Sequence, residues 1–564
     1  MAEGGPRVAL VGMGPRGLFA LERLVHHAAA TATALDVDAY EPHPAAGAGP
    51  HYDPAQPSFL RMNLPSGAVD MWPAGTGAGP SFVEWAAASG APVDRDGHAA
   101  RSLVGRYLSD GLARVLDAAG RAGVAVRVRD ERVRGIERGG PFWAVHAGAG
   151  GAARPDAYDE VLLCTGHAPA RPGRGMDPAA ARVARGVYPV GRCLGEGEVP
   201  AGARVAVRGM ALTFMDAALA LTEGRGGAFA PGPAAAPHRG TYEPSGREPA
   251  AILPFSRAGR VMPAKPSPAL IRGNAALDRA DARGRAAVAG LPPGAGVADG
   301  LVPVLARAAD AALVAVGAVA AGAGRMADLI GALMDPVAGG AEDPAAELER
   351  SILVGHGLRA PGADWALGHV WRSLYPAIVA RLGGDGLSED LWPAMRDLEA
   401  GMERVAFGPG LANAERLLAL IRCGPVDTTH AAGGAVVAAP GGGLQLASPA
   451  GATVVDRVVD AVLAPPGAEV GDPLLDALIA AGHVRPRPGR RGLDIRADGS
   501  CRGADGRVRA GLAAAGRATE DVVIGNDTLS RELHPALDAW AAGVVARHRA
   551  VPAAAGATPL GATP

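Results

Sequence analysis

The chain has 564 residues, of which 48% are hydrophobic and 20% are charged, and its formal net charge is -2. A chain of this length exceeds what one hydrophobic core usually supports, so we expect two or three domains. The balanced charge leaves no basic excess to neutralise a phosphate backbone, which excludes nucleic acid as an expected partner.

Membrane attachment and export are not expected either. The first residues do not place a basic segment before an apolar run, so no signal peptide is predicted. The apolar stretch 308–324 is short, consists largely of Ala and Gly, and is flanked by Arg307 and Arg325. Such a stretch favours a buried helix over a membrane span. We therefore expect a cytoplasmic protein.

Two rare residue types are informative. Lys265 is the single lysine among 55 Lys and Arg residues, which favours a role that arginine cannot fill, although chance retention explains it equally well. The four cysteines are scattered and form no CxxC pair; they are Cys164, Cys193, Cys423 and Cys501. This spacing argues against a redox dithiol, a zinc knuckle and a disulfide framework, and no metal site is predicted.

The chain begins with a strand–turn–helix–strand pattern. We expect a strand at Arg7–Val11, a helix at Gly17–Ala30 and a second strand at Leu35–Glu41. The turn between the first two elements reads GMGPRG, which has the GxGxxG spacing of dinucleotide-binding turns. This pattern predicts a Rossmann unit at the start of the chain.

Each position of this turn has a predicted role. Gly12 permits the tight turn, Gly14 lets a pyrophosphate approach the backbone, and Gly17 allows close helix–strand packing. Glu41, at the end of the second strand, would accept both hydroxyls of the adenosine ribose. The alternative is a glycine turn without a ligand. The predicted cofactor contacts of the turn are Gly12, Gly14, Pro15, Arg16 and Gly17.

Later segments favour FAD over NAD in this unit. The apolar run ending at Thr165 and Gly166 has the form of a second cofactor contact in two-dinucleotide flavoproteins. Near the C-terminus, Gly516 and then Asn526, Asp527 and Thr528 precede an expected helix whose N-terminus would face the flavin. The alternative for this last segment is an ordinary helix capped by Asn or Asp.

The remaining elements alternate along the chain before a long helical region. Residues 270–425 are expected to be mostly helical. The other predicted helices are Leu103–Ala122 and Thr213–Glu223, and the predicted strands are Val124–Arg129, Val133–Arg138, Phe142–His146, Asp159–Cys164, Arg204–Val207, Val454–Val462 and Leu512–Gly516.

A second glycine turn follows the strand at Arg204–Val207. It contains Gly209 and Thr213, but Ala211 stands where a second glycine is usual. We expect NADPH to bind at this turn, with Arg208 or Arg225 near its 2′-phosphate. The alternative is a structural Rossmann unit without a ligand.

Two long polar segments carry the candidate catalytic residues. Gly47–Trp72 contains Asn63, and Tyr242–Pro266 contains the single lysine. The predicted catalytic residues are Lys265, Arg257 and Asn63, and Asn63 is also a candidate cofactor contact. Arg257, Arg260 and Lys265 are predicted to bind a carboxylate or phosphate of the substrate. The alternative is a solvated basic loop.

These motifs together resemble a family of FAD/NAD(P)-binding proteins of actinobacteria. The resemblance covers about residues 5–540 and is carried by VALVGMGPRGLFALERL, GAGPHYDP, LRMNLPSG, VLLCTGH, VAVRGMALTFMDAALALTEGRGGAF, YEPSGREP, FSRAGR, VAFGPGLANAERLLALI and VVIGNDTLSRELHP. Within it, the chain is similar to flavin-dependent L-aspartate N-monooxygenases, which form nitrosuccinate.

The resemblance implies an FAD- and NADPH-dependent N-monooxygenase that uses O₂. It would oxidise the amino group of an amino acid through a C4a-hydroperoxyflavin, and L-aspartate through N-hydroxyaspartate to nitrosuccinate is the sharpest version. The alternatives are a flavin monooxygenase or NADPH oxidase acting on another small molecule, and a non-catalytic flavin redox sensor.

The predicted fold is α/β, with two Rossmann-like dinucleotide-binding domains, for FAD and NADPH, and a mostly helical insertion. The FAD-binding domain comprises 1–200 and 493–550, and the NADPH-binding domain comprises 201–269 and 426–492. The helical insertion spans 270–425, and a disordered tail spans 551–564. Self-association into a homo-oligomer is left open.

Overall fold

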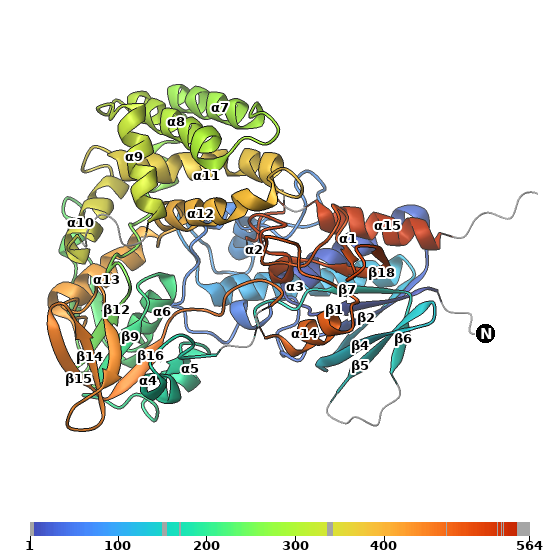
Figure 1. The fold of residues 1–564 in the computed structure, drawn as a ribbon, viewed down its shortest axis with the longest axis horizontal. Coiled ribbons are helices and arrows are strands. Elements are labelled where there is room, and N and C mark those ends of the chain that lie inside the picture. Colours follow the sequence, from blue (N-terminus) through green and yellow to red (C-terminus); the bar gives the residue numbers. More distant parts are fainter. Residues whose placement is uncertain are drawn as a thin grey trace, which may run out of the picture.

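The structure is a computed structural model that describes residues 5–148, 155–168, 171–335, 342–469, 471–526, 528–531, 533 and 535–549. The predicted cofactor contact Asp527 and the predicted tail 551–564 lie outside the described residues. Parallel sheets, antiparallel sheets and a block of helices together confirm the predicted α/β class (Figure 1).

A six-stranded sheet is built from both ends of the chain. Its strand order is β17-β18-β7-β1-β2-β3, and all neighbours run parallel except β17 and β18. The strands are β1 (Arg7–Val11), β2 (Leu35–Tyr40), β3 (Val124–Arg129), β7 (Glu160–Leu163), β17 (Ser500–Arg502) and β18 (Val508–Ala514). The first glycine turn therefore follows a central strand.

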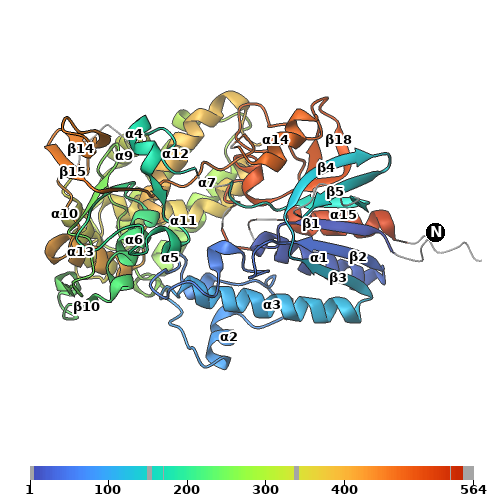
Figure 2. The same cartoon turned by 90° about the horizontal axis from the view of Figure 1, so that it is seen from below.

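Alternating residues of β1 reach two different cores. Val8 and Leu10 pack with helices α1 (Pro15–Thr31), α3 (Arg101–Arg121) and α15 (Ala536–His548). Ala9 and Val11 pack with β4 (Val133–Gly139), β5 (Phe142–Ala147), β6 (Asp156–Tyr158) and α14 (Pro473–Ala480). The sheet is thus covered on both faces (Figure 2). Strand β1 has a continuous run of buried residues, which requires cover on both sides. Helix α2 (Phe82–Ala88) lies beside α3.

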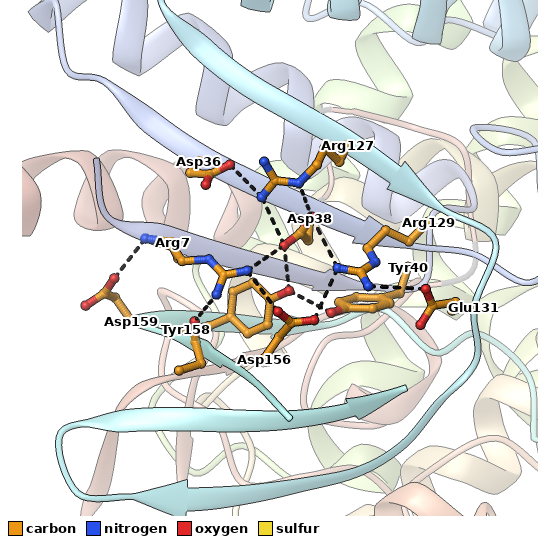
Figure 3. Close-up of polar contacts among 11 residues, drawn as sticks. Arg7, Asp36, Asp38, Tyr40, Arg127, Arg129, Glu131, Asp156, Tyr158 and Asp159 are labelled. Atoms are coloured by element: carbon orange, nitrogen blue, oxygen red, sulfur yellow. Dashed lines mark hydrogen bonds and ion pairs between the residues drawn. The ribbon is translucent and has the colours of Figure 1, made fainter. Parts of the chain in front are cut away.

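A buried carboxylate ties this sheet to the β4-β5-β6 sheet (Figure 3). Asp38 is fully buried, and it accepts hydrogen bonds from Arg127 Nε at 2.8 Å, Arg7 Nη2 at 3.0 Å and Tyr158 Oη at 2.6 Å. Burial opposes its ionisation, yet these donors hold the pKa of Asp38 below its ordinary value. Asp38 lies in the middle of β2, opposite Ala9 of β1 and Arg127 of β3.

A second sheet has the order β12-β9-β16-β8, and all its neighbours run parallel. Its strands are β8 (Arg185–Gly186), β9 (Arg204–Arg208), β12 (Ala251–Phe255) and β16 (Arg457–Asp460). One face packs on α5 (Val190–Cys193), α6 (Leu212–Ala220) and α13 (Leu411–Cys423). The other face packs on α4 (Pro178–Val183) and the β13-β14-β15 sheet.

Residues 270–425 are helical, as predicted. The helices are α7 (Ala275–Ala289), α8 (Val302–Ala315), α9 (Ala323–Met334), α10 (Pro344–Gly355), α11 (Ala363–Leu382), α12 (Trp392–Ala406) and α13. Trp371 and Trp392 are fully buried at the centre of the core that α7–α9, α11 and α12 share. Among the described helices, none is both long and apolar enough to cross a bilayer.

Two expectations about elements are wrong, and several strands were not predicted. The strand expected at Val454–Val462 is divided at Asp456 into β15 (Gly451–Val455) and β16, because β15 pairs with β14 whereas β16 pairs with β9. The helix expected directly after Asn526 is missing from the described residues there, and α15 begins only at Ala536. The antiparallel strands β10 (Ala228–Ala230), β11 (Thr241–Glu243), β13 (Ala435–Ala438) and β14 (Leu444–Ser448) were not predicted.

Candidate functional site

The first glycine turn has the geometry that its spacing predicts. Gly12 has a φ of 101°, and a Cβ there would lie 2.2 Å from the Cys164 carbonyl oxygen. A Cβ on Gly17 would lie 2.2 Å from the Gly12 carbonyl oxygen, so helix α1 packs directly on the turn. By contrast, no atom lies within 4 Å of the Cβ position of Gly14. The backbone at Gly14 is therefore open to an approaching group.

Helix α1 presents its N-terminus at this opening. Gly14 is the N-cap and offers no side-chain cap, and Pro15 occupies the first turn. The first amides of α1 are thus left without a side-chain acceptor, and they carry the positive end of the helix dipole. This arrangement fits a pyrophosphate, so the residues present suit the phosphates of FAD.

Glu41 is held beside the turn by backbone amides. It is 8% exposed and accepts hydrogen bonds from Met13 N at 2.9 Å and His43 N at 3.0 Å, one on each carboxylate oxygen. Each oxygen has further lone pairs, so the fixed carboxylate can accept ribose hydroxyls as well.

Arg16 joins the turn to the C-terminal segment. Its guanidinium donates to the Asn526 carbonyl oxygen at 2.8 Å and to the Thr528 carbonyl oxygen. Gly516, with a φ of 75°, packs against the Arg16 side chain. The structure therefore brings together four predicted cofactor residues that lie at opposite ends of the chain.

Asn526 also carries an unsatisfied acceptor. Its Nδ2 donates to Glu520 Oε2 at 2.7 Å and to the Val523 carbonyl oxygen at 3.1 Å, which fixes the orientation of the amide. Its Oδ1 is buried and has no partner among the described residues. A buried acceptor without a donor is unfavourable, so Oδ1 is free to accept from a ligand.

Thr165 and Gly166 follow β7, next to the first turn. Cys164 N donates to the Val11 carbonyl oxygen at 2.8 Å, and Gly166 has a φ of 74°. The predicted second contact segment therefore lies at the same edge of the sheet as Gly12.

Two histidines close to this edge were not predicted. The rings of His51 and His167 lie 6.5 Å apart, and Arg517 Nε lies 3.5 Å from His167 Nε2. His51 keeps a solvent-accessible edge, but the surrounding protein and nearby Arg101 lower its pKa to about 3. Both histidines stand inside quoted motifs, GAGPHYDP and VLLCTGH, and that position was the signal to single them out.

The second glycine turn repeats the backbone of the first. Gly209 has a φ of 106°, and its N–H donates to the Phe255 carbonyl oxygen at 2.8 Å, as Gly12 N donates to Tyr40 at 2.9 Å. Ala211 is the N-cap of α6, and Thr213 is buried in its first turn.

The two predicted 2′-phosphate contacts have partners within the protein. Arg225 is 4% exposed and donates to the carbonyl oxygens of Leu194, Val199 and Arg247. These bonds do not support a contact of Arg225 with NADPH. Arg208 donates to the Arg174 carbonyl oxygen at 2.7 Å and lies 3.3 Å from Asp460.

Lys265 and Asn63 are in contact. Lys265 is 8% exposed, its Nζ donates to the Asn63 carbonyl oxygen, and Nζ lies 5.5 Å from the centre of the Phe407 ring. Burial, and to a smaller extent Arg372, lowers the pKa of Lys265 to about 7. The single lysine is therefore a buried amine that exchanges its proton near neutral pH, which an arginine could not do.

The predicted cationic cluster is not a single group. Arg257 is exposed and comes two residues after the end of β12, whereas Lys265 is buried against Asn63. Arg260 lies near Glu342 and lowers the pKa of that carboxyl after the larger effect of Arg350. The segment after β12 changes neighbours along its course: Ser256 N donates to the Ala431 carbonyl oxygen, whereas Lys265 N donates to the Pro409 carbonyl oxygen.

A buried ion pair links helix α3, which packs on the six-stranded sheet, to helix α6, which packs on the second parallel sheet. Arg101 of α3 donates to Asp216 of α6 at 2.6 Å, and Tyr188 donates to the same carboxylate oxygen. Asp216 is 2% exposed and Arg101 is 8% exposed. No sequence signal distinguished these residues from surface charges.

Comparisons with known proteins show which family and which relatives this chain resembles. Residues 9–168 match the FAD-NAD(P)-binding family. Over 43% of its length, the chain is 31% identical to an L-aspartate N-monooxygenase (nitrosuccinate-forming) of Streptomyces cremeus, covering 40% of that protein. It is 30% identical to a nitrosuccinic acid synthase of Aspergillus oryzae, over 43% of this chain and 38% of that one. The match thus spans less than half the length of these relatives.

Solved structures show only a distant likeness. An ornithine N-hydroxylase of Kutzneria sp. 744 is 14% identical with a TM-score of 0.48, over 97% of this chain and 100% of that one. L-lysine 6-monooxygenase from Pseudomonas syringae is 13% identical with a TM-score of 0.44, over 96% and 99%. These values are too low to assign an activity. The chain therefore carries an FAD-NAD(P)-binding region at residues 9–168, and its predicted resemblance to nitrosuccinate-forming L-aspartate N-monooxygenases is confirmed.

Proposed function

We propose that the protein is an FAD- and NADPH-dependent N-monooxygenase that oxidises the amino group of an amino acid. L-aspartate, oxidised through N-hydroxyaspartate to nitrosuccinate, is the proposed substrate, because the curated relatives are named for that reaction. The observation that carries the proposal is the contact between Lys265 and Asn63. The contact supports the proposal because a buried amine, whose pKa burial lowers to about 7, lies against a residue of the matched region 9–168.

The proposed domain organisation follows the two parallel sheets. We assign FAD to 1–200 and 493–550, NADPH to 201–269 and 426–492, and the border of the cleft to the helical insertion 270–425. The supporting observation is that β17 and β18 extend the sheet of β1, whereas β16 pairs with β9.

FAD would be held by the first turn, Glu41 and the C-terminal segment. Gly14 and the N-terminus of α1 would receive the pyrophosphate, and the free Oδ1 of Asn526 would accept from the cofactor. When bound, FAD would supply the redox chemistry: it can accept a hydride from NADPH and activate O₂.

The residues that follow β12 suit the 2′-phosphate of NADPH better than Arg208 and Arg225, which were predicted to contact it. Gly209 N bonds Phe255 as Gly12 N bonds Tyr40, so Ser256 occupies the position after its strand that Glu41 occupies after β2. Ser256 has no carboxylate to repel a 2′-phosphate, and the exposed Arg257 is adjacent. We therefore propose Arg257 as the 2′-phosphate contact rather than a catalytic residue.

Lys265 would move a proton on the substrate. An amino group reacts with an oxygen electrophile only in its neutral form, and a buried lysine with a pKa of about 7 can accept the proton of a substrate ammonium. Its protonated form would then face a carboxylate of the same substrate. The burial of Lys265 also keeps water away from Nζ.

The test is turnover by the purified flavoprotein with NADPH, O₂ and L-aspartate. We expect aspartate to accelerate NADPH oxidation and to gain oxygen by mass spectrometry. NADPH oxidation that no amino acid accelerates would instead indicate an oxidase. A bound flavin that NADPH does not reduce would indicate a redox sensor.

Lys265 has a matched pair of substitutions. Lys265→Met and Lys265→Arg should both retain FAD, and both should lose most of the aspartate-dependent rate at neutral pH. The arginine variant keeps the charge but cannot release its proton. A wild-type rate in Lys265→Arg would remove proton transfer from the role of this residue.

A further inference from the structure

A cavity of about 170 Å³ lies between the Lys265 segment and two helices of the insertion. Its walls are Pro263, Ala264 and Pro266, residues of α10, the loop into α11, residues of α11 and Val405 of α12. Lys265 itself does not line it, because its Nζ contacts Asn63 on another side. None of the lining residues belongs to the FAD-binding region 9–168. The cavity is therefore separate from the flavin site.

One wall of the cavity is cationic and incompletely paired. Arg372 of α11 donates to the Ala406 carbonyl oxygen at 2.7 Å and has no carboxylate partner among the described residues. Burial lowers its pKa to about 10, so its charge lacks compensation. Arg359 is exposed at the rim of the same wall. The N-terminus of α11 also opens here, and its N-cap Gly362 has no side-chain cap.

Helix α10 supplies both an anion and a cation to the cavity, Glu347 and Arg350, and Arg350 is paired with Glu342. Glu347 of α10 is 8% exposed; its Oε1 lies 3.2 Å from Arg404, while its Oε2 is buried without a partner in the described chain. Burial raises the pKa of Glu347, and Arg404 opposes that change only in part. Asp364, in the first turn of α11, lines the same cavity. One small space is thus bordered by an unsatisfied carboxylate oxygen and by an arginine that has no carboxylate partner among the described residues.

We propose that this cavity is a second binding site, for a small α-amino acid in its zwitterionic form. The α-carboxylate would lie at Arg372 and Arg359, and the ammonium group would lie at Glu347 and Asp364. The volume is well below the ~300–1,000 Å³ of pockets for drug-sized ligands, so the occupant is a small metabolite. This site does not depend on the proposed oxidation.

The site has a connection to Lys265. Arg372 lines the cavity, and its charge lowers the pKa of Lys265 further, after the larger effect of burial. A carboxylate on Arg372 would reduce that repulsion. Binding of a carboxylate in the cavity would therefore favour the protonated form of Lys265. This effect would link the cavity to the residue proposed to accept the proton of the substrate.

The experiment is titration calorimetry of the FAD-loaded protein with L-alanine. Propionate and ethylamine serve as controls, because each is alanine without one of its two charged groups. We expect saturable binding of alanine at one site and at least about tenfold weaker binding of either control. Absence of saturable heat with alanine, or propionate binding as tightly as alanine, would overturn the proposal.

Matched substitutions on the same two helices locate the site. Arg372→Met and Glu347→Gln should each weaken alanine binding at least about tenfold. Arg381→Met, also on α11 and bonded to the Leu291 carbonyl oxygen, should leave it unchanged, as should Glu349→Gln on α10, which pairs with Arg422. Equal losses in the cavity variants and these controls would refute the location.

Lys265→Met separates this site from the proposed function. The variant should still bind alanine, because Lys265 does not line the cavity. Loss of alanine binding in Lys265→Met with full binding in Arg372→Met would overturn the inference. Binding as expected together with no amino-acid-dependent NADPH oxidation would refute the proposed function alone.

Discussion

The two glycine turns share a backbone and differ in the space above it. Gly12 and Gly209 have φ values of 101° and 106°, and each donates its N–H to the last residue of the adjacent strand. Their N-caps also match, with φ and ψ of -74° and -166° at Gly14 and -92° and -164° at Ala211. Only the first turn lacks a Cβ at the N-cap. The same local fold is therefore open to close phosphate approach at one site and partly filled at the other.

The strands beside the turns differ in charge. Glu41 follows β2, whereas Ser256 and Arg257 follow β12. A carboxylate accepts hydrogen bonds from ribose hydroxyls but repels a 2′-phosphate. An arginine, by contrast, attracts the 2′-phosphate. The comparison teaches that one repeated backbone unit acquires different steric and electrostatic surroundings from one methyl group and from the residues that follow one strand.

Substitution of the first glycine should produce the largest effect. Gly12→Ala puts a Cβ 2.2 Å from the Cys164 carbonyl oxygen, in addition to the ~1–2 kcal/mol cost of a positive φ. We expect loss of most bound FAD and a clearly lower Tm. In Gly209→Ala the nearest atoms lie at 3.4 Å, so only the backbone cost applies and FAD should be retained. Flavin absorbance and thermal melts measure both; equal FAD loss would break the comparison.

Reversal of the charge after β12 should alter the coenzyme preference. Arg257→Asp removes the proposed contact with the 2′-phosphate and introduces repulsion, so kcat/KM for NADPH should fall about 100-fold relative to that for NADH. Stopped-flow flavin reduction with each coenzyme measures this ratio. Arg247→Asp, at a surface pair with Glu196, is the matched control. An unchanged ratio in Arg257→Asp would remove this residue from the coenzyme site.

The segment after β12 also carries Lys265, which has no counterpart after β2. Its folded pKa of about 7 lies below the unfolded value, so the unfolded state binds more protons between about pH 7 and 10. The stability of the protein should therefore rise with pH across this window. At pH 7 the buried charge costs a few kcal/mol, so Lys265→Met should have the higher Tm there. That advantage should shrink at pH 9; a constant Tm difference would contradict the lowered pKa.

Exchange of the N-cap residues should give the smallest effect. Gly14→Ala adds a methyl group in open space, so Tm should change little while FAD binding weakens about tenfold. Ala211→Gly removes the corresponding methyl group and should lower KM for NADPH a few-fold. Fluorescence titration of FAD and steady-state kinetics measure the two effects. If Ala211→Gly raises KM, close approach at the second turn is not limiting.

Much of the fold could be predicted from the sequence because the signals are local. Glycine spacing predicted both turns, and apolar runs predicted β1, β2, β3 and β9 with little error. The expectations failed where local pattern and tertiary contact diverge. The strand expected at 454–462 divides at Asp456 because its two halves pair with strands of different sheets. The carbonyl oxygens of Asn526 and Thr528 accept hydrogen bonds from Arg16.

The candidate site was predictable in its residue types but not in its arrangement. Lys265 was notable as the single lysine, yet its contact with Asn63, 202 residues away, depends on how β12 directs the chain. Arg257 and Lys265 are close in sequence but occupy different environments. Arg372 and Glu347 gave no signal, since charged residues on helices are usually solvated.

By itself, the sequence determined the first glycine turn, its acidic partner Glu41 and the helical insertion. These features depend on φ values, spacing and periodicity within a few tens of residues. The tertiary structure alone decided which cations are buried, which are exposed and which lie beside Arg372 in the cavity. The physical reason is that burial and charge pairing depend on contacts between distant segments, which no local pattern specifies.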